Sequence, residues 1–158
     1  MKKVYLIIIL IVIVIGVVLL LPKNNNEIDD KEILEMEEIF IEINDNLLTV
    51  KLEDNSSSRA FLERLKNGNI TIHARDYGNF EKVGKLGFSL PTNDKRITTE
   101  PGDLILYQGD KITLYYDTNT WTFTKLGKVI DINSDELKRI LGSHDVEMTF
   151  KRRMKDEK

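Results

Sequence analysis

Residues 102–117 read GDLILYQGDKITLYYD, the pattern of two β-strands joined by a tight turn. The β-prone runs 104–107 and 112–116 flank a short polar segment that contains Gly109 and Asp110, which is typical of a hairpin. In the second run apolar and polar side chains alternate, which predicts a half-buried antiparallel strand. We expect the rest of the folded chain to pack around this hairpin.

Length and composition exclude several classes of protein. The 158 residues leave room for one domain of about 100–150 residues and an appendage. The net charge of −3 creates no positive field, so we expect no nucleic-acid partner. Disulfides and cysteine-based metal sites are excluded because the chain has no cysteine. His73 and His144 lack the spacing of metal ligands, and we expect neither a metal nor a cofactor.

The appendage is an apolar run at residues 4–21, which at about 1.5 Å per residue is close to the thickness of a bilayer core. A cleaved signal peptide has the same basic start, but the run ends in Leu21-Pro22 without the small residues of a cleavage site. We therefore expect residues 1–21 to be an uncleaved signal-anchor, a single transmembrane helix followed by a polar stalk at 22–36. The lysines at positions 2 and 3 place the N-terminus in the cytoplasm and the domain outside the cell membrane.

The domain itself is expected at residues 37–153, followed by a charged tail at 154–158. Alternating patterns and turn residues predict a hairpin at 39–52 and strands at 69–75, 121–124, 129–132 and 146–150, with a bend or bulge at Gly127 between the strands at 121–124 and 129–132. Cap residues and helical spacing predict helices from about 56 to 66 and at 134–141. The segment 76–96 has only weak strand signals, and long segments of this kind often carry function. Many short strands with two short helices indicate a mainly β fold, a barrel or a sandwich.

Five segments resemble the cyclophilin-like domain family, small prokaryotic domains similar in fold to cyclophilins. They are LPTN at 90–93, PGDLILY at 101–107, LYY at 114–116, KLGKV at 125–129 and LGSHDV at 141–146. The resemblance covers about residues 39–151. It implies a closed antiparallel β-barrel with a helix across each end.

Cyclophilins are prolyl isomerases, and the resemblance therefore raises that activity as an alternative. Their activity depends on an arginine that hydrogen-bonds the prolyl amide and on an apolar pocket for the ring. Their signature joins Phe-His-Arg to a later Gln-Gly-Gly-Asp-Phe. This chain has Ile72-His73-Ala74-Arg75 and lacks the second segment. We therefore favour a membrane-anchored, extracytoplasmic module that binds a peptide or small molecule, with a divergent isomerase of exported proteins as the alternative.

The candidate ligand-binding residues are His73, Arg75, Asp76, Glu81, Tyr115 and Trp121. The first four can form a polar cluster between the strand 69–75 and the long segment; the alternative is an ordinary solvated strand face. Tyr115 and Trp121 join an aromatic body to a polar group, which suits the rim of a pocket. Tyr116 and Phe123 are expected to fill the barrel.

We predict that the full-length protein remains in the membrane fraction after alkaline carbonate extraction, because residues 4–21 are long enough to span and lack a cleavage site. Immunoblotting of pellet and supernatant measures this. Release of a shortened protein into the supernatant would contradict it.

Overall fold

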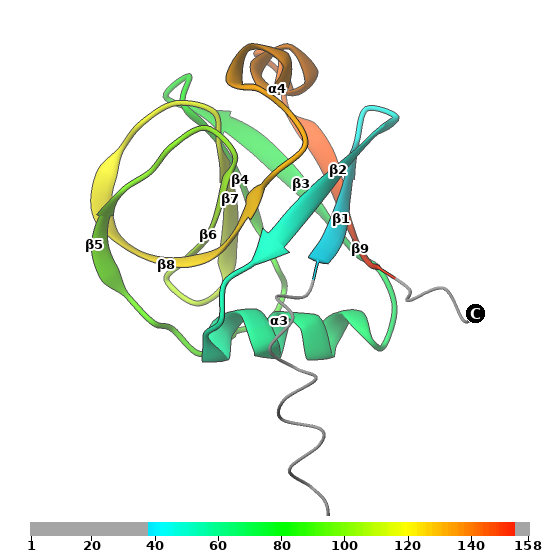
Figure 1. Ribbon diagram of the computed structural model, residues 1–158, viewed down its shortest axis with the longest axis vertical. Helices are drawn as coiled ribbons and strands as arrows, with labels where there is room; N and C mark the ends of the chain where they lie inside the picture. The colour runs from blue at the N-terminus through cyan, green and yellow to red at the C-terminus, as the bar shows by residue number, and fades with distance from the viewer. Residues whose placement is uncertain (1–37, 154–158) are drawn as a thin grey trace, which may run out of the picture. The chain divides into compact units, whose positions relative to one another are not determined.

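The structure is a computed structural model that describes residues 38–153. Its elements are β1 Glu38–Ile43, β2 Asn46–Leu52, α3 Ser56–Leu65, β3 Ile70–Tyr77, β4 Glu81–Lys85, β5 Lys95–Thr98, β6 Asp103–Tyr107, β7 Lys111–Tyr115, β8 Thr120–Val129, α4 Ser134–Leu141 and β9 Val146–Arg152 (Figure 1). The predicted anchor, stalk and charged tail lie outside the described residues. Within 38–153, no helix has the length and apolar character needed to cross a bilayer.

The strands form a closed antiparallel barrel. Their order is β2-β1-β9-β3-β4-β7-β6-β8, and β2 also pairs with β8, which closes the ring. The ninth strand, β5, pairs only with the first half of β8 and lies outside the ring. The structure therefore confirms a mainly β barrel with two helices, and closure distinguishes it from a sandwich.

Local sequence signals explain the hairpins and helices. Asn44 and Asp45 both have positive φ, the backbone of the two-residue turn that joins β1 to β2. Asn55 and Asn133 cap the helices: each side-chain oxygen accepts a hydrogen bond from the backbone N–H three residues later, at 2.9 Å. The helices close opposite ends of the barrel, α3 at one end and α4 at the other (Figure 1).

Two of the predicted boundaries were wrong. The segment 76–96 contains β4 and part of β5, which were missed because their charged residues hide the alternation. The bulge predicted at Gly127 is confirmed, because the pairing of β6 with β8 shifts by one residue there. The predicted division into strands at 121–124 and 129–132 is wrong, because β8 runs without a break from Thr120 to Val129. A side chain at Gly127 would meet the backbone oxygen of Lys51 at 2.5 Å, so β2 and β8 approach closely only because this residue is glycine.

A second apolar cluster lies on the outer side of the barrel wall. It joins Ile105 and Tyr115 of the wall to Phe123, and Ile97 packs against it from β5. We call residues 95–98 and 120–123, the paired strand ends that carry Ile97 and Phe123, the β5–β8 arm. Because the arm covers β7, that strand is buried on both faces rather than half-buried, and Phe123 packs outside the barrel rather than filling it.

The end of the barrel under α4 contains a buried ammonium group. Lys82 is fully buried, and its Nζ donates hydrogen bonds to Asp76 Oδ1 at 2.6 Å, the Gly142 carbonyl at 2.9 Å and the His144 carbonyl at 2.8 Å. Tyr116 donates its hydroxyl to the same Asp76 oxygen. Burial acts to raise the pKa of Asp76, but the hydrogen bonds from Lys82 and Tyr116 outweigh it and lower that pKa.

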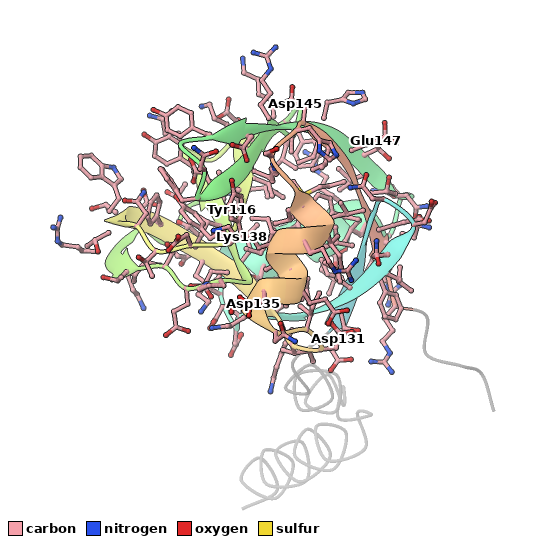
Figure 2. The ribbon with its side chains drawn as sticks, turned by 90° about the horizontal axis from the view of Figure 1, so that it is seen from above. Tyr116, Asp131, Asp135, Lys138, Asp145 and Glu147 are labelled. Carbon is pink, nitrogen blue, oxygen red and sulfur yellow. The ribbon has the colours of Figure 1, made fainter. Side chains whose placement is uncertain are left out.

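This cluster fastens α4 to the barrel. Gly142 ends α4, and its φ of 57° turns the chain toward β9. Figure 2 looks down on α4 lying across the barrel end, with Tyr116 and Asp145 labelled near it. The three oxygen partners of Lys82 come from β3 and the α4–β9 connection, so one side chain joins parts of the chain that are far apart in sequence.

We predict that Lys82→Met lowers the free energy of unfolding by about 3–5 kcal/mol, because it removes the ammonium that neutralises the Asp76 carboxylate and leaves two carbonyls without their donor. Lys85→Met is the matched control: Lys85 lies on the same strand but is exposed, and its loss should change stability by less than about 0.5 kcal/mol. Urea denaturation followed by circular dichroism measures both. Equal stabilities for the two variants would show that the cluster does not fasten the barrel end.

Candidate functional site

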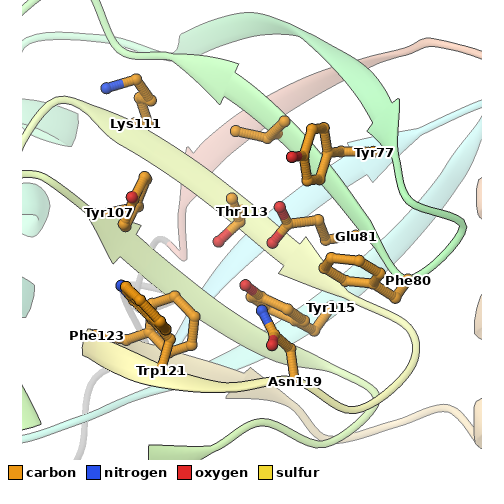
Figure 3. Close-up of a pocket in the computed structure, with 11 residues that line it drawn as sticks. Tyr77, Phe80, Glu81, Tyr107, Lys111, Thr113, Tyr115, Asn119, Trp121 and Phe123 are labelled. Atoms are coloured by element: carbon orange, nitrogen blue, oxygen red, sulfur yellow. The ribbon is translucent and has the colours of Figure 1, made fainter. Parts of the chain in front are cut away.

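A pocket of about 370 Å³ opens on the outer wall of the barrel, between the β3–β4 turn and the β5–β8 arm (Figure 3). Its aromatic lining consists of Tyr77, Phe80, Tyr107, Tyr115, Trp121 and Phe123. Its other lining residues are Glu81, Val83, Lys111, Thr113 and Asn119. The pocket therefore combines a largely aromatic wall with a few polar groups, as ligand sites commonly do.

Strand register explains why these side chains meet. Residues that are paired across antiparallel strands project from the same face of the sheet. Glu81 pairs with Tyr115, and Val83 pairs with Thr113, where β4 meets β7. Tyr107 of β6 pairs with Lys111 of β7 in the same way. Since the alternate residues of these strands fill the barrel, this whole set faces outward.

The aromatic rings are packed against one another. The ring centroids of Phe80 and Tyr115 lie 6.1 Å apart with an interplanar angle of 19°, and those of Tyr115 and Phe123 lie 5.7 Å apart. Tyr77 meets Phe80 edge to face at 5.9 Å. At the mouth, Tyr77 is 60% exposed and Trp121 is 56% exposed, so the rim presents large apolar surfaces to solvent.

Glu81 is the unusual group in this pocket. Its side chain is held among the aromatic residues and is only 8% exposed, and its Oε2 has no hydrogen-bond partner within residues 38–153. Burial raises the pKa of the Glu81 carboxyl, and the facing Tyr115 hydroxyl offsets this only in part. The pKa of Tyr115 is also raised, first by burial and then by the Glu81 carboxylate, so the hydroxyl remains protonated.

Thr113 is a second polar group without a partner. Its Oγ1 is buried and makes no hydrogen bond within the described part of the chain. Figure 3 shows the Thr113 and Glu81 side chains side by side on the pocket floor, with Tyr115 next to them. Two buried oxygens in one place therefore lack a hydrogen-bond partner within residues 38–153, and the Tyr115 hydroxyl beside them has only one proton to donate.

Lys111 lies at the other end of the pocket and does not neutralise Glu81. Its Nζ binds Asp110 Oδ1 and Gln108 Oε1, both at 2.9 Å, and lies 5.7 Å from the centre of the Tyr107 ring. The charge of Lys111 is thus balanced by its neighbour in the chain. No ion pair involves Glu81 among the described residues.

The structure brings together three of the six candidate residues named from the sequence: Glu81, Tyr115 and Trp121 all line the pocket. Arg75 is exposed on β3 and pairs with Val83, so it lies on the same outer face at the edge of the pocket.

The other two candidates lie elsewhere. His73 is exposed and faces Glu147, 3.6 Å away. Asp76 turns to the barrel end and binds Lys82, so the expected polar cluster of Asp76 with Glu81 does not form. Side chains alternate along β3, so Asp76 faces inward whereas its neighbours face outward. Asp76 therefore lies on the opposite face of the barrel wall from Glu81.

Sequence reasoning missed seven polar and aromatic lining residues: Tyr77, Phe80, Tyr107, Lys111, Thr113, Asn119 and Phe123. For two of them a signal was present. Lys111, Thr113 and Tyr115 alternate with the core residues of β7 and therefore share its outer face. Naming Tyr115 as a candidate thus also pointed to Lys111 and Thr113. Tyr77 and Phe80 flank the β3–β4 turn, whose second strand was not predicted.

Comparison with known proteins gives one family and one fold. The sequence profile described as the cyclophilin-like family matches residues 41–151. The solution structure of a hypothetical protein from Archaeoglobus fulgidus is similar with a TM-score of 0.55 and 14% sequence identity, over 75% of this chain and 96% of that chain. At this identity the likeness shows the fold alone. No curated protein matches the chain.

We predict that Glu81→Gln stabilises the protein at neutral pH and has no such effect in acid. An unfolded glutamate has a pKa of about 4.3, and that of folded Glu81 is higher, so the parent protein loses stability as the pH rises through the interval between them. Glutamine is neutral at every pH and avoids this loss. Urea denaturation in acidic and neutral buffers measures it.

The control is Glu63→Gln on α3, where the carboxylate is exposed and pairs with Lys66. The two variants should differ in how stability changes with pH. Identical pH dependence would mean that the folded protein does not raise the pKa of Glu81.

Proposed function

Because the chain belongs to the cyclophilin-like family, we propose that its barrel is a ligand-binding module whose site is the pocket on the outer wall. The observation that carries this proposal is the buried Glu81 carboxyl with an unpartnered oxygen beneath an exposed aromatic rim. Buried polar groups in folded proteins nearly always have partners. A ligand that supplies the missing partner explains why the group is there.

A purely structural role for these residues explains less. An aromatic cluster alone would attach the β5–β8 arm to the barrel wall, as Ile105, Tyr115 and Phe123 do. That structural role does not require a buried carboxyl, and an unpartnered buried oxygen lowers the free energy of unfolding by about 1–3 kcal/mol. Local choices that reduce stability without a structural return are expected at functional sites.

The size of the pocket supports a small occupant. Its volume of about 370 Å³ lies near the lower end of the roughly 300–1,000 Å³ usual for ligand pockets. A compact organic molecule or a single side chain of a bound peptide fits this space. Tyr77 and Trp121 at the mouth would cover the apolar part of the ligand, while Glu81 and Thr113 would bind its polar end.

We further propose that the module works outside the cell, tethered to the membrane through residues 4–21. The apolar run, its basic start and the polar stretch at 22–36 support this arrangement. In that location the module would meet ligands that are exported, imported or exposed at the cell surface.

A divergent prolyl isomerase is the second candidate, and one observation favours it. Arg75 is exposed at the edge of an aromatic pocket, which is the pair of features that the resemblance to cyclophilins associates with catalysis. The Gln-Gly-Gly-Asp-Phe segment that accompanies them in cyclophilins is absent from the sequence. A protease-coupled proline-isomer assay separates the candidates: rate acceleration lost in Arg75→Ala would favour the enzyme.

We predict that small benzyl compounds bind the pocket and change the fluorescence of Trp121, the only tryptophan in the chain. Tyr77→Ala should weaken this binding about fivefold, because it removes one aromatic wall. Leu47→Ala is the matched control, since Leu47 is 55% exposed but does not line the pocket. Titration of the full-length protein in detergent micelles measures the affinity of the parent protein, of Tyr77→Ala and of Leu47→Ala.

The proposal would be overturned if no benzyl compound gave a saturable change in fluorescence. It would also be overturned if Tyr77→Ala and Leu47→Ala weakened binding equally, because the compounds would then bind exposed apolar surface in general.

A further inference from the structure

We propose that the ligand carries an organic cation, an ammonium or guanidinium group, that binds to Glu81 on the floor of the pocket. This inference rests on the proposed function and specifies the chemistry of the ligand. It follows from the acceptors that lack partners, from the aromatic walls around them and from the charges nearby.

The groups left without partners call for a hydrogen-bond donor. Glu81 Oε2 and Thr113 Oγ1 are both buried and unsatisfied within residues 38–153. An ionised carboxylate can only accept hydrogen bonds, and a hydroxyl can also accept them. An ammonium has three N–H donors and a guanidinium has five, so either group can serve both oxygens at once.

The walls of the pocket suit a positive charge. The faces of aromatic rings carry negative potential, and cations bind over them when they are shielded from water. Tyr77, Phe80 and Tyr115 lie beside Glu81, and Trp121 lies across the pocket from it (Figure 3). An anionic ligand would meet these ring faces and a carboxylate together, and both would repel it.

The neighbouring residue shows what a buried charge requires in this protein. Lys82 points into the barrel end, where its ammonium is fully buried and has three oxygen partners. Glu81, one residue earlier, points to the outer face, forms no ion pair among the described residues and has an Oε2 without a hydrogen-bond partner there. The missing partner of the carboxylate is therefore a cation from outside.

Other positive groups near the pocket do not fill this role. Lys111 is bound to Asp110 and Gln108. Arg75 and Lys85 are exposed on the outer face, where solvent and salt screen their charges. A ligand cation that enters the aromatic space is shielded from this screening and meets the carboxylate directly.

Proton linkage follows from the same geometry. Of the groups around the pocket that carry charge or a titratable proton, Tyr77 of β3 and Tyr115 of β7 are paired with Glu81, whereas Arg75 of β3, Tyr107 of β6 and Lys111 of β7 lie farther along the same outer face. The cation binds the ionised carboxylate, so the affinity should rise with pH as Glu81 loses its proton and then level off. A neutral ligand should show no such rise.

Three probes of similar shape test the inference: benzylammonium, benzyl alcohol and phenylacetate, which are a cation, a neutral molecule and an anion. They are titrated into the full-length protein in detergent micelles, with Trp121 fluorescence as the signal. We expect benzylammonium to bind at least about tenfold more tightly than the other two at neutral pH, as for a hydrogen bond to a charged group. In acidic buffer this advantage should shrink.

Glu81→Gln should abolish the advantage of the cation, and Glu63→Gln should retain it. Glutamine has nearly the shape of glutamate, and urea denaturation verifies that the variant is folded. A short peptide with one central lysine, compared with its norleucine counterpart, distinguishes a peptide side chain from a small molecule as the source of the cation.

The outcomes separate this inference from the proposed function. Saturable binding of all three probes with equal affinity, or a cation advantage that survives Glu81→Gln, overturns the inference and leaves the pocket as a binding site. If none of the probes binds saturably, the proposed function fails and the inference fails with it.

Discussion

The buried ammonium of Lys82 is the constraint on which the arrangement of this barrel depends. Its position is fixed, because it donates hydrogen bonds to three oxygens from β3 and from the α4–β9 connection. Side chains alternate along a strand, so a lysine held inward at position 82 requires that Glu81 and Val83 face outward. The polar contact that closes the barrel end thus also determines which residues of β4 reach the pocket.

Burial of charge has opposite consequences on the two faces of β4. On the inner face, Lys82 and Asp76 compensate each other, and the pKa of Asp76 is lowered. On the outer face, Glu81 is desolvated by the aromatic residues, the Tyr115 hydroxyl compensates this only in part, and the pKa of Glu81 is raised. The first arrangement stabilises the fold, whereas the second reduces stability and is typical of a ligand-binding site.

The pocket exists because β8 is longer than the barrel requires. Its second half closes the ring with β6 and β2, and its first half continues outward and pairs with β5. The resulting arm brings Trp121 and Phe123 over the wall that carries Tyr115. A concave surface is therefore built where a barrel wall would otherwise be convex and exposed to solvent.

By itself the sequence determined the elements with strong local chemistry: the hairpins with their turn residues, both capped helices and the family resemblance that implies a barrel. It also identified Glu81, Tyr115 and Trp121 as candidates from residue type. Only the tertiary structure decided that these three meet, that Asp76 leaves them for Lys82 and that Phe123 lies outside the barrel. The physical reason is that β4 contains charged residues, and whether these are buried depends on partners far along the chain. Closure of the ring depends in turn on the pairing of β2 with β8, which no local sequence pattern indicates.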